Sequence, residues 1–181
     1  LRLATTDERY AQRLAEVLHA VGKPALPALA KALEDPHSHR RFNAIHALGL
    51  FGGDGVPALT LALKDADKVV RQNASKVLAG MGAAALPGLA IAIKEGETNV
   101  RVEAVAGLSR IGAPAVPSLV QALADEDSQV RGLAIDGLGR MNEDAAGALA
   151  RELSAASPAV RARILEALAA MGPKAKPAAA A

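Results

Sequence analysis

Residues 92–117 read AIKEGETNVRVEAVAGLSRIGAPAVP, and residues 122–142 read ALADEDSQVRGLAIDGLGRMN. The two stretches share one pattern at a spacing of thirty residues: an acidic residue, then Val-Arg, then Ala and Leu at helical spacing. Self-similarity at a fixed period of this length is the signature of a repeat architecture. The period therefore points to the fold class.

The thirty-residue period extends over the whole chain. Arginine recurs at Arg41, Arg71, Arg101, Arg131 and Arg161, with acidic residues six positions earlier at Asp35, Asp65, Glu95 and Asp125. Leucine recurs at Leu18, Leu48, Leu78, Leu108, Leu138 and Leu168. Glycine recurs at Gly22, Gly52, Gly82, Gly112 and Gly172, and proline at Pro27, Pro57, Pro87, Pro117 and Pro177. Asn142, Gly147 and Ala155 interrupt the glycine, proline and acidic columns, so the unit around them is the least regular.

Each unit predicts two antiparallel helices. The first carries apolar residues at i, i+3 and i+7, as at Leu26, Leu29 and Leu33, and the column proline falls in its first turn, where it is tolerated. Second helices are expected to begin near residues 8, 38, 68, 98, 128 and 158. Favourable N-cap residues stand at several of these starts, namely Asp67, Asp127 and Ser157.

A helix pair of this size cannot bury its apolar stripe alone, so neighbouring pairs must stack. The sequence predicts an all-α fold, an α-solenoid of about six thirty-residue helix pairs in a single domain, 1–181. The expected units are a partial repeat 1–22, repeats 23–52, 53–82, 83–112, 113–142 and 143–172, and a partial repeat 173–181. Leu3 stands where a first helix ends and Ala178–Ala181 stand inside another, so we expect an excerpt of a longer array.

The composition excludes several classes of protein and site. The formal net charge is only +2, and 2% of the residues are aromatic, which disfavours nucleic-acid binding. The absence of cysteine excludes disulfides and thiolate metal sites. The longest uncharged run, 77–93, is shorter than a membrane span and contains Gly and Pro. We expect a cytoplasmic protein that inserts into no membrane.

The repeated unit, with its acidic residue, Val-Arg, spaced Ala and Leu, Gly and Pro, resembles the HEAT repeat. It is most similar to the short bacterial HEAT-like repeats of the phycobilisome-lyase type. The resemblance covers nearly the whole chain and implies a binding surface rather than an active site. It also implies that the structural ladder, formed by the acidic and arginine columns, carries charge-assisted hydrogen bonds at the turns, within or between repeats. Arg161, which lacks an acidic residue six positions earlier, is a candidate free anion contact.

No motif in the sequence indicates catalysis or a cofactor. His37, His39 and His46 lie close together, but Asp35 belongs to the ladder, and we interpret the histidines as surface residues rather than metal ligands. There is no serine in a nucleophile elbow and no glycine-rich phosphate loop after a strand. We therefore expect a non-enzymatic protein with no metal and no cofactor.

Variation between units is concentrated on the second helix. Constant columns stack the repeats, so exposed positions that differ between repeats are those expected to recognise a partner. Positions two, six and ten of the second helix, counted from the arginine column, lie four apart and share one side. With a neighbouring apolar position, they give the expected partner-binding residues Phe42, His46, Leu50, Lys76, Val102, Arg110, Leu133, Asp136 and Arg140.

The leading functional hypothesis is a non-catalytic protein-binding module that holds a protein or peptide along the second-helix face. Phe42 and Leu50 are expected to supply apolar anchors. Two alternatives remain open: a bilin-lyase-like subunit that handles an open-chain tetrapyrrole, which the resemblance suggests, and an architectural segment of a larger assembly.

Overall fold

The computed structural model describes residues 17, 20–141, 143–173 and 175. Within these residues the chain forms five consecutive helix pairs and no β-strand. The pairs are α2 (Leu26–Ala32) with α3 (Ser38–Gly49), α4 (Val56–Ala62) with α5 (Lys68–Gly80), α6 (Leu86–Glu95) with α7 (Thr98–Ile111), α8 (Val116–Ala122) with α9 (Ser128–Gly139), and α10 (Glu143–Ala155) with α11 (Pro158–Met171).

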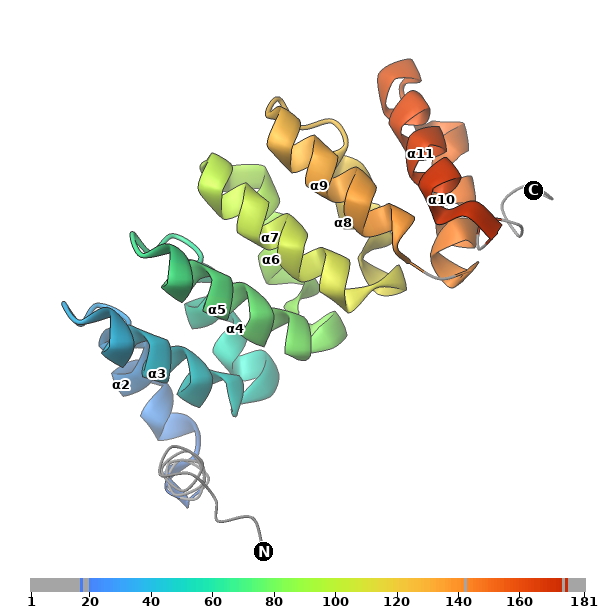
Figure 1. The fold of residues 1–181 in the computed structure, drawn as a ribbon. Coiled ribbons are helices and arrows are strands. Elements are labelled where there is room, and N and C mark those ends of the chain that lie inside the picture. Colours follow the sequence, from blue (N-terminus) through green and yellow to red (C-terminus); the bar gives the residue numbers. More distant parts are fainter. Residues whose placement is uncertain (1–16, 18–19, 142, 174, 176–181) are drawn as a thin grey trace, which may run out of the picture.

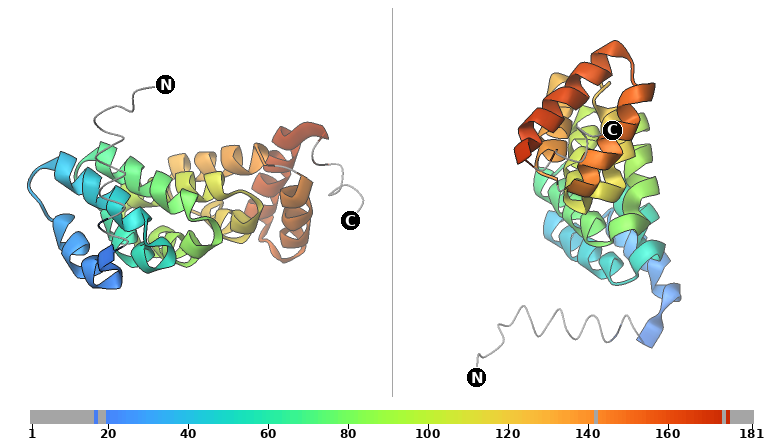
Figure 2. Two further views of the ribbon diagram at one scale, coloured as in Figure 1. Left: turned by 90° about the horizontal axis from the view of Figure 1, so that it is seen from below. Right: turned by 90° about the vertical axis from the view of Figure 1, so that its right-hand side faces the viewer.

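The helix pairs stack side by side into two layers. Figure 1 shows the second helices, α3, α5, α7, α9 and α11, in front of the first helices, α2, α4, α6, α8 and α10. Each second helix packs on the next second helix along the chain as well as on its own partner. Figure 2 shows the resulting elongated array, with the blue pair at one end and the red pair at the other. The chain is an all-α solenoid, as its period predicts.

The second helices begin where the sequence predicts. They start at Ser38, Lys68, Thr98, Ser128 and Pro158. The side chain of Asp67 accepts a hydrogen bond from the Val69 amide, and Asp127 and Ser157 cap their helices in the same way. These caps satisfy amides that have no acceptor within the helix. The start expected near residue 8 lies outside the described residues.

Proline shortens the first helices. A 3₁₀ turn precedes each of α2, α4, α6 and α8: η1 (Lys23–Ala25), η2 (Gly52–Gly55), η3 (Gly82–Ala85) and η4 (Ala113–Ala115). The column proline then occupies the first turn of the α-helix, because its ring would clash with a carbonyl four residues earlier in a continuous helix. Gly147 replaces proline in α10, and this helix runs unbroken from Glu143.

The apolar core lies between the two layers and continues from pair to pair. The leucine column contributes side chains with no exposed surface at Leu48, Leu78, Leu108 and Leu138. First helices contribute Leu59, Leu89, Leu119 and Leu149, which are equally buried. All eight belong to one contiguous cluster of buried residues. The pairs therefore share one core rather than possessing one each.

The structure does not test two predictions, which concern the chain ends and the repeat boundaries. The residues expected to begin and end a longer array, Leu3 and Ala178–Ala181, lie outside the described part of the chain. The exact repeat boundaries remain predictions. Among the described residues, no helix is both long enough and apolar enough to cross a membrane.

The glycine that ends α7 provides a test of the turn geometry. Gly112 has φ 85° and ψ −145°, a conformation that residues with a Cβ rarely adopt, although a Cβ there would touch nothing. Gly112→Ala should therefore lower the free energy of unfolding by about 2 kcal/mol through backbone strain alone. Gly132→Ala is the matched control, since it lies within α9 with equally open surroundings, and it should stabilise the protein by about 0.5–1 kcal/mol. Chemical denaturation followed by circular dichroism measures both. Equal effects of the two substitutions would contradict the explanation.

Candidate functional site

The arginine column joins consecutive helix pairs by ion pairs that span 24 residues. Arg41 Nε lies 2.6 Å from Asp65 Oδ2, and Nη2 donates to Oδ1 at 2.8 Å. Its Nη1 donates to the main-chain carbonyl of Asp35 at 2.9 Å. Asp65 Oδ1 also accepts from the Asp67 amide at 2.8 Å. One guanidinium therefore binds the turn of its own pair and the carboxylate of the next.

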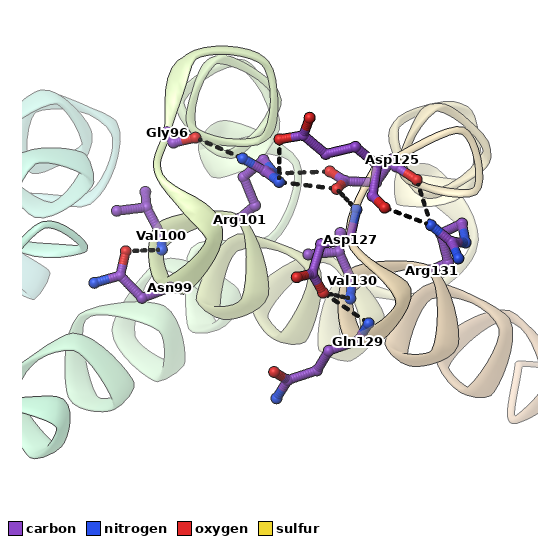
Figure 3. A network of polar contacts seen from close by, with 10 residues as sticks. Gly96, Asn99, Val100, Arg101, Asp125, Asp127, Gln129, Val130 and Arg131 are labelled. Atoms are coloured by element: carbon purple, nitrogen blue, oxygen red, sulfur yellow. Dashed lines mark hydrogen bonds and ion pairs between the residues drawn. The ribbon is translucent and has the colours of Figure 1, made fainter.

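The same arrangement recurs at Arg101, which Figure 3 shows with its neighbours. Arg101 Nε and Nη2 donate to the two carboxylate oxygens of Asp125 at 2.8 and 3.0 Å, and Nη1 donates to the Gly96 carbonyl at 3.1 Å. The side chains of Arg101 and Asp125 are 12% and 7% exposed. Bidentate, nearly buried pairs of this kind are stronger than surface ion pairs. The column thus links α7 to the turn after α8.

Two positions of the ladder lack the ion pair, which differs from the expectation that each column carboxylate meets a column arginine. Glu95 forms no ion pair among the described residues. Its helix, α6, continues through Glu95 itself, whereas α4 and α8 end three residues before their aspartates. The Glu95 side chain therefore projects from the last residue of a helix, whereas the side chains of Asp65 and Asp125 project from turns. At the other position, 24 residues after Arg131, the chain has Ala155.

Without a carboxylate, Arg71 has only main-chain acceptors. Its Nη1 donates to the carbonyls of Asp65 and Ala66 at 2.8 and 2.9 Å. Its buried Nε has no hydrogen-bond partner. Arg131 donates to the corresponding carbonyls of Asp125 and Glu126. Among the column arginines in the described part of the chain, Arg71 is the one with a buried nitrogen that has no hydrogen-bond partner.

The ends of the ladder also differ from the sequence expectation. Asp35 pairs with Arg40 at 3.2 Å and with His37 at 3.1 Å rather than with a column arginine. Arg161 was expected to be a free anion contact, but its Nε and Nη2 donate to the carbonyls of Leu153 and Ala156. The carbonyls of its own turn thus occupy Arg161 as they do the other members of the column.

The turn geometry lowers the pKa of two ladder carboxylates. A hydrogen bond from the His37 amide, with help from Arg40, lowers the pKa of Asp35 to about 2. Burial acts to raise the pKa of Asp65, but the hydrogen bonds from Arg41 and the Asp67 amide outweigh it, and the pKa falls. Both carboxylates are therefore charged at neutral pH.

Seven of the nine expected partner-binding residues lie on second helices, while Leu50 and Arg140 directly follow the ends of α3 and α9. His46, Leu50, Lys76, Arg110, Asp136 and Arg140 are exposed. Phe42 is half-buried, and its ring lies 4.8 Å from that of His46 between centroids. Val102 and Leu133 are half-buried and pack against the core with one side. Asp136 and Arg140 form an ion pair with each other at 3.0 Å.

A groove of about 740 Å³ crosses α5, α7 and α9 on the second-helix face. It brings together four of the expected residues, Lys76, Val102, Arg110 and Leu133. Its other lining residues include Lys68, Arg71, Gln72, Glu103, Ala106 and Gln129. A smaller hollow beside it is lined by Arg110, Leu133 and Arg140. Phe42 lies elsewhere, in a hollow with Asn43 and Val69.

Glu103 is the one acidic residue that lines the groove. It is only 7% exposed, and burial raises the pKa of its carboxyl, against the opposing charges of Arg71, Arg110, Lys68 and Lys76. Its main-chain carbonyl accepts a hydrogen bond from Ser75 at 2.7 Å, which ties α7 to α5. The groove thus holds one buried carboxyl group among four cationic side chains.

The three histidines highlighted by the sequence do not form a metal site in the described residues, where no group of three suitable ligands occurs. His37 contacts Asp35, and its ring lies 5.6 Å from that of His39 in an edge-on arrangement. His46 turns instead to the Phe42 ring.

Lys68, Arg71 and Glu103 line the groove but are not among the partner-binding residues that the sequence predicts. Arg71 was assigned to the ladder because it shares the column with Arg41 and Arg101. The sequence does contain one local indication that the partner of Arg71 is missing. Asp65 and Asp125 are followed two residues later by aspartate, while Glu95 is followed by Gly96 and Glu97. That departure indicates a different turn, and with it an arginine without its usual partner.

The ladder predicts unequal costs for equivalent arginine substitutions. Arg101→Ala removes a bidentate ion pair and leaves Asp125 nearly buried without its counter-charge, so the free energy of unfolding should fall by about 2–4 kcal/mol. Arg131→Ala removes only hydrogen bonds to carbonyls and should cost about 1–2 kcal/mol. Urea denaturation of both variants provides the comparison. A larger loss for Arg131→Ala would contradict the assigned register.

The lowered pKa of Asp65 predicts a dependence on pH. Because the folded pKa lies below the unfolded value of about 3.9, the ion pair stabilises the fold above about pH 4 and loses this effect as the pH falls through the folded pKa. Asp65→Asn should therefore lower the melting temperature at pH 7, and the difference from the unmodified protein should shrink below pH 4. A constant difference between pH 7 and pH 3 would show that the charge of Asp65 does not stabilise the fold.

The chain is similar to several solved structures at low sequence identity. A comparison with curated proteins gave no match. Among solved structures, the chain is similar to an engineered protein (21% identity, 89% of this chain and 88% of the other covered, TM-score 0.43). It is also similar to a chain in a structure described as "TOG-tubulin binding specificity promotes microtubule dynamics and mitotic spindle formation" (16% identity, 97% and 89% covered, TM-score 0.45). A third is a computationally designed armadillo repeat protein for modular peptide recognition (21% identity, 91% and 94% covered, TM-score 0.39).

A family model supplies the assignment. The model for HEAT repeats matches residues 56–120 and again residues 116–181, which together make up more than half of the chain. Both matched segments contain the helix pairs and the arginine column described above. The chain belongs to the HEAT-repeat family.

Proposed function

We propose that this protein is a non-catalytic scaffold that binds a segment of another protein along its second-helix face. The observation that carries the proposal is the groove across α5, α7 and α9. Its walls are built from positions that differ from repeat to repeat, such as Lys76 and Ala106, or Val102 and Gly132, while the stacking columns stay constant. This division between constant core and variable surface is typical of recognition by solenoids.

The first-helix face is the rival surface. Leu61 and Ile91 are exposed apolar residues of α4 and α6, with 64% and 53% of their surface accessible. They are single side chains of the kind that most protein surfaces carry. The groove on the other face combines half-buried apolar side chains with charged ones, as binding sites generally do.

A peptide-display selection with a steric block on each face tests the proposal. Ala106 is half-buried and lines both hollows of the groove, so Ala106→Trp should fill the groove and weaken the selected peptides at least tenfold. Ile91→Trp places the same bulk on the first-helix face and should leave their affinity unchanged. Melting curves check that both variants fold. The opposite pattern, or a selection that yields no binding peptide, would contradict the proposal.

We extend the proposal to the type of HEAT repeat and to the source of the protein. The sequence resemblance supports a phycobilisome-lyase type of HEAT repeat, and the bias toward Ala, Gly, Leu and Arg supports a bacterial source. We also propose a cytoplasmic location. A bilin-handling subunit is the alternative within that type, and a change in visible absorption on addition of an open-chain tetrapyrrole would favour it. The groove's lining residues include no aromatic side chain to hold a chromophore, which supports the peptide instead.

A further inference from the structure

The charges of the groove are strongly one-sided. Lys68, Arg71 and Lys76 reach it from α5 and Arg110 from α7, whereas Glu103 is the single acidic lining residue. None of the four cations forms an ion pair with a carboxylate within the described residues. The whole chain carries a net charge of only +2, so this excess is local. A partner segment that supplies carboxylates would find four side chains ready to pair.

The cationic excess has a structural origin in the interrupted ladder. At Arg41 and Arg101 an aspartate of the next pair neutralises the guanidinium. At Arg71 the corresponding residue, Glu95, is held in α6, and Arg71 lines the groove with its Nε unsatisfied. A buried donor without a partner is costly, so the incomplete ladder position destabilises this part of the array. The groove lies where the ladder is incomplete.

The remaining walls suit an apolar side chain. Val102 and Leu133 are half-buried groove residues that pack on the core, and Ala106 between them leaves space. Neighbouring helices pack about 10 Å apart, so a path from α5 to α9 is about 20 Å long. An extended peptide covers this distance with about six residues at roughly 3.3 Å each.

Nucleic acid fits the groove less well, although it too is anionic. Binding of single strands relies on stacking of bases on aromatic side chains as well as on positive charge. The groove has no aromatic lining residue, and Glu103 would repel a phosphate backbone. A peptide can place an amide donor, rather than a phosphate, beside that carboxyl group.

We propose that the groove between α5, α7 and α9 receives an extended acidic peptide segment that contains an apolar side chain. This inference rests on the proposed function and specifies the chemistry of the partner. Lys76 and Arg110 pair with the carboxylates of the peptide, Arg71 adds positive charge to the groove wall, and Val102 and Leu133 contact the apolar side chain.

Fluorescence anisotropy with three labelled decapeptides tests the charge preference. The acidic peptide GEDLEELDEG should bind at least tenfold more tightly than the neutral GSNLSSLNSG and the basic GKRLKKLRKG. Its affinity should fall as salt rises from 50 to 500 mM, because exposed charges are screened. Equal affinities for the three peptides, or preference for the basic one, would overturn the inference. So would tighter binding of a labelled single-stranded DNA at the same site.

Charge-matched variants locate the binding. Lys76→Glu with Arg110→Glu should weaken the acidic peptide at least tenfold. Lys31→Glu with Lys94→Glu makes the same change in net charge on exposed residues of α2 and α6 and should leave the affinity within about twofold. Equal losses in both double variants would show long-range attraction instead of a site. Glu103→Gln removes the groove's carboxyl group and should tighten binding severalfold, and unchanged or weaker binding would overturn the placement beside Glu103.

The outcomes also separate this inference from the broader proposal. Selected peptides that lose affinity in Ala106→Trp but carry no acidic residues would leave the scaffold function standing and overturn the acidic preference. The same holds for peptides that depend on Phe42 and Leu50, outside the groove. If no peptide binds to the second-helix face, both the scaffold function and the acidic preference are wrong.

Discussion

The structure depends on a single constraint: no helix pair in this chain can bury its apolar stripe by itself. The leucines at 48, 78, 108 and 138 are completely buried only because each lies between its own first helix and the neighbouring pairs. Hydrophobic burial therefore accumulates across interfaces between repeats, and the repeats are stable as an array. Every other feature, from the proline in the first turn to the glycine at the end of the second helix, fits the chain to this stacking.

The sequence was sufficient for the fold because the fold is local and repeated. Three second helices begin at the side-chain caps Asp67, Asp127 and Ser157, and the column residues mark the other units at the same thirty-residue spacing. A single short apolar pattern predicts a helix only weakly, but the same pattern in several units makes the prediction of helices firm. Where the pattern is interrupted, at Gly147, the structure also departs, with one long first helix in place of a turn and a short helix.

The candidate site was less accessible from the sequence, for a geometric reason. The ladder pairs residues that are 24 apart, whereas the sequence leaves open whether the partners belong to the same repeat or to neighbouring repeats. Only three-dimensional stacking shows that Arg71 would need Glu95 and that α6 carries this glutamate away from it. Likewise helical spacing predicts exposed side chains at Val102 and Leu133, whereas in the structure both contact the core as well as the groove. The charged residues of the face, such as Lys76 and Arg110, follow from helical spacing alone.

The alternation of complete and incomplete positions in the ladder has a consequence for how the helix pairs are joined. Ion pairs cross from α3 to the turn after α4 and from α7 to the turn after α8, but among the residues that the structure describes neither the junction after α5 nor the junction after α9 has one. The ladder thus joins the helix pairs two by two, and a seam without a ladder ion pair separates one couple from the next. One seam separates α5 from α7, the two helices that supply the cations of the groove. At this seam, packing of α5 on α7 and the hydrogen bond from Ser75 to the Glu103 carbonyl hold the two groove helices together in place of a ladder ion pair.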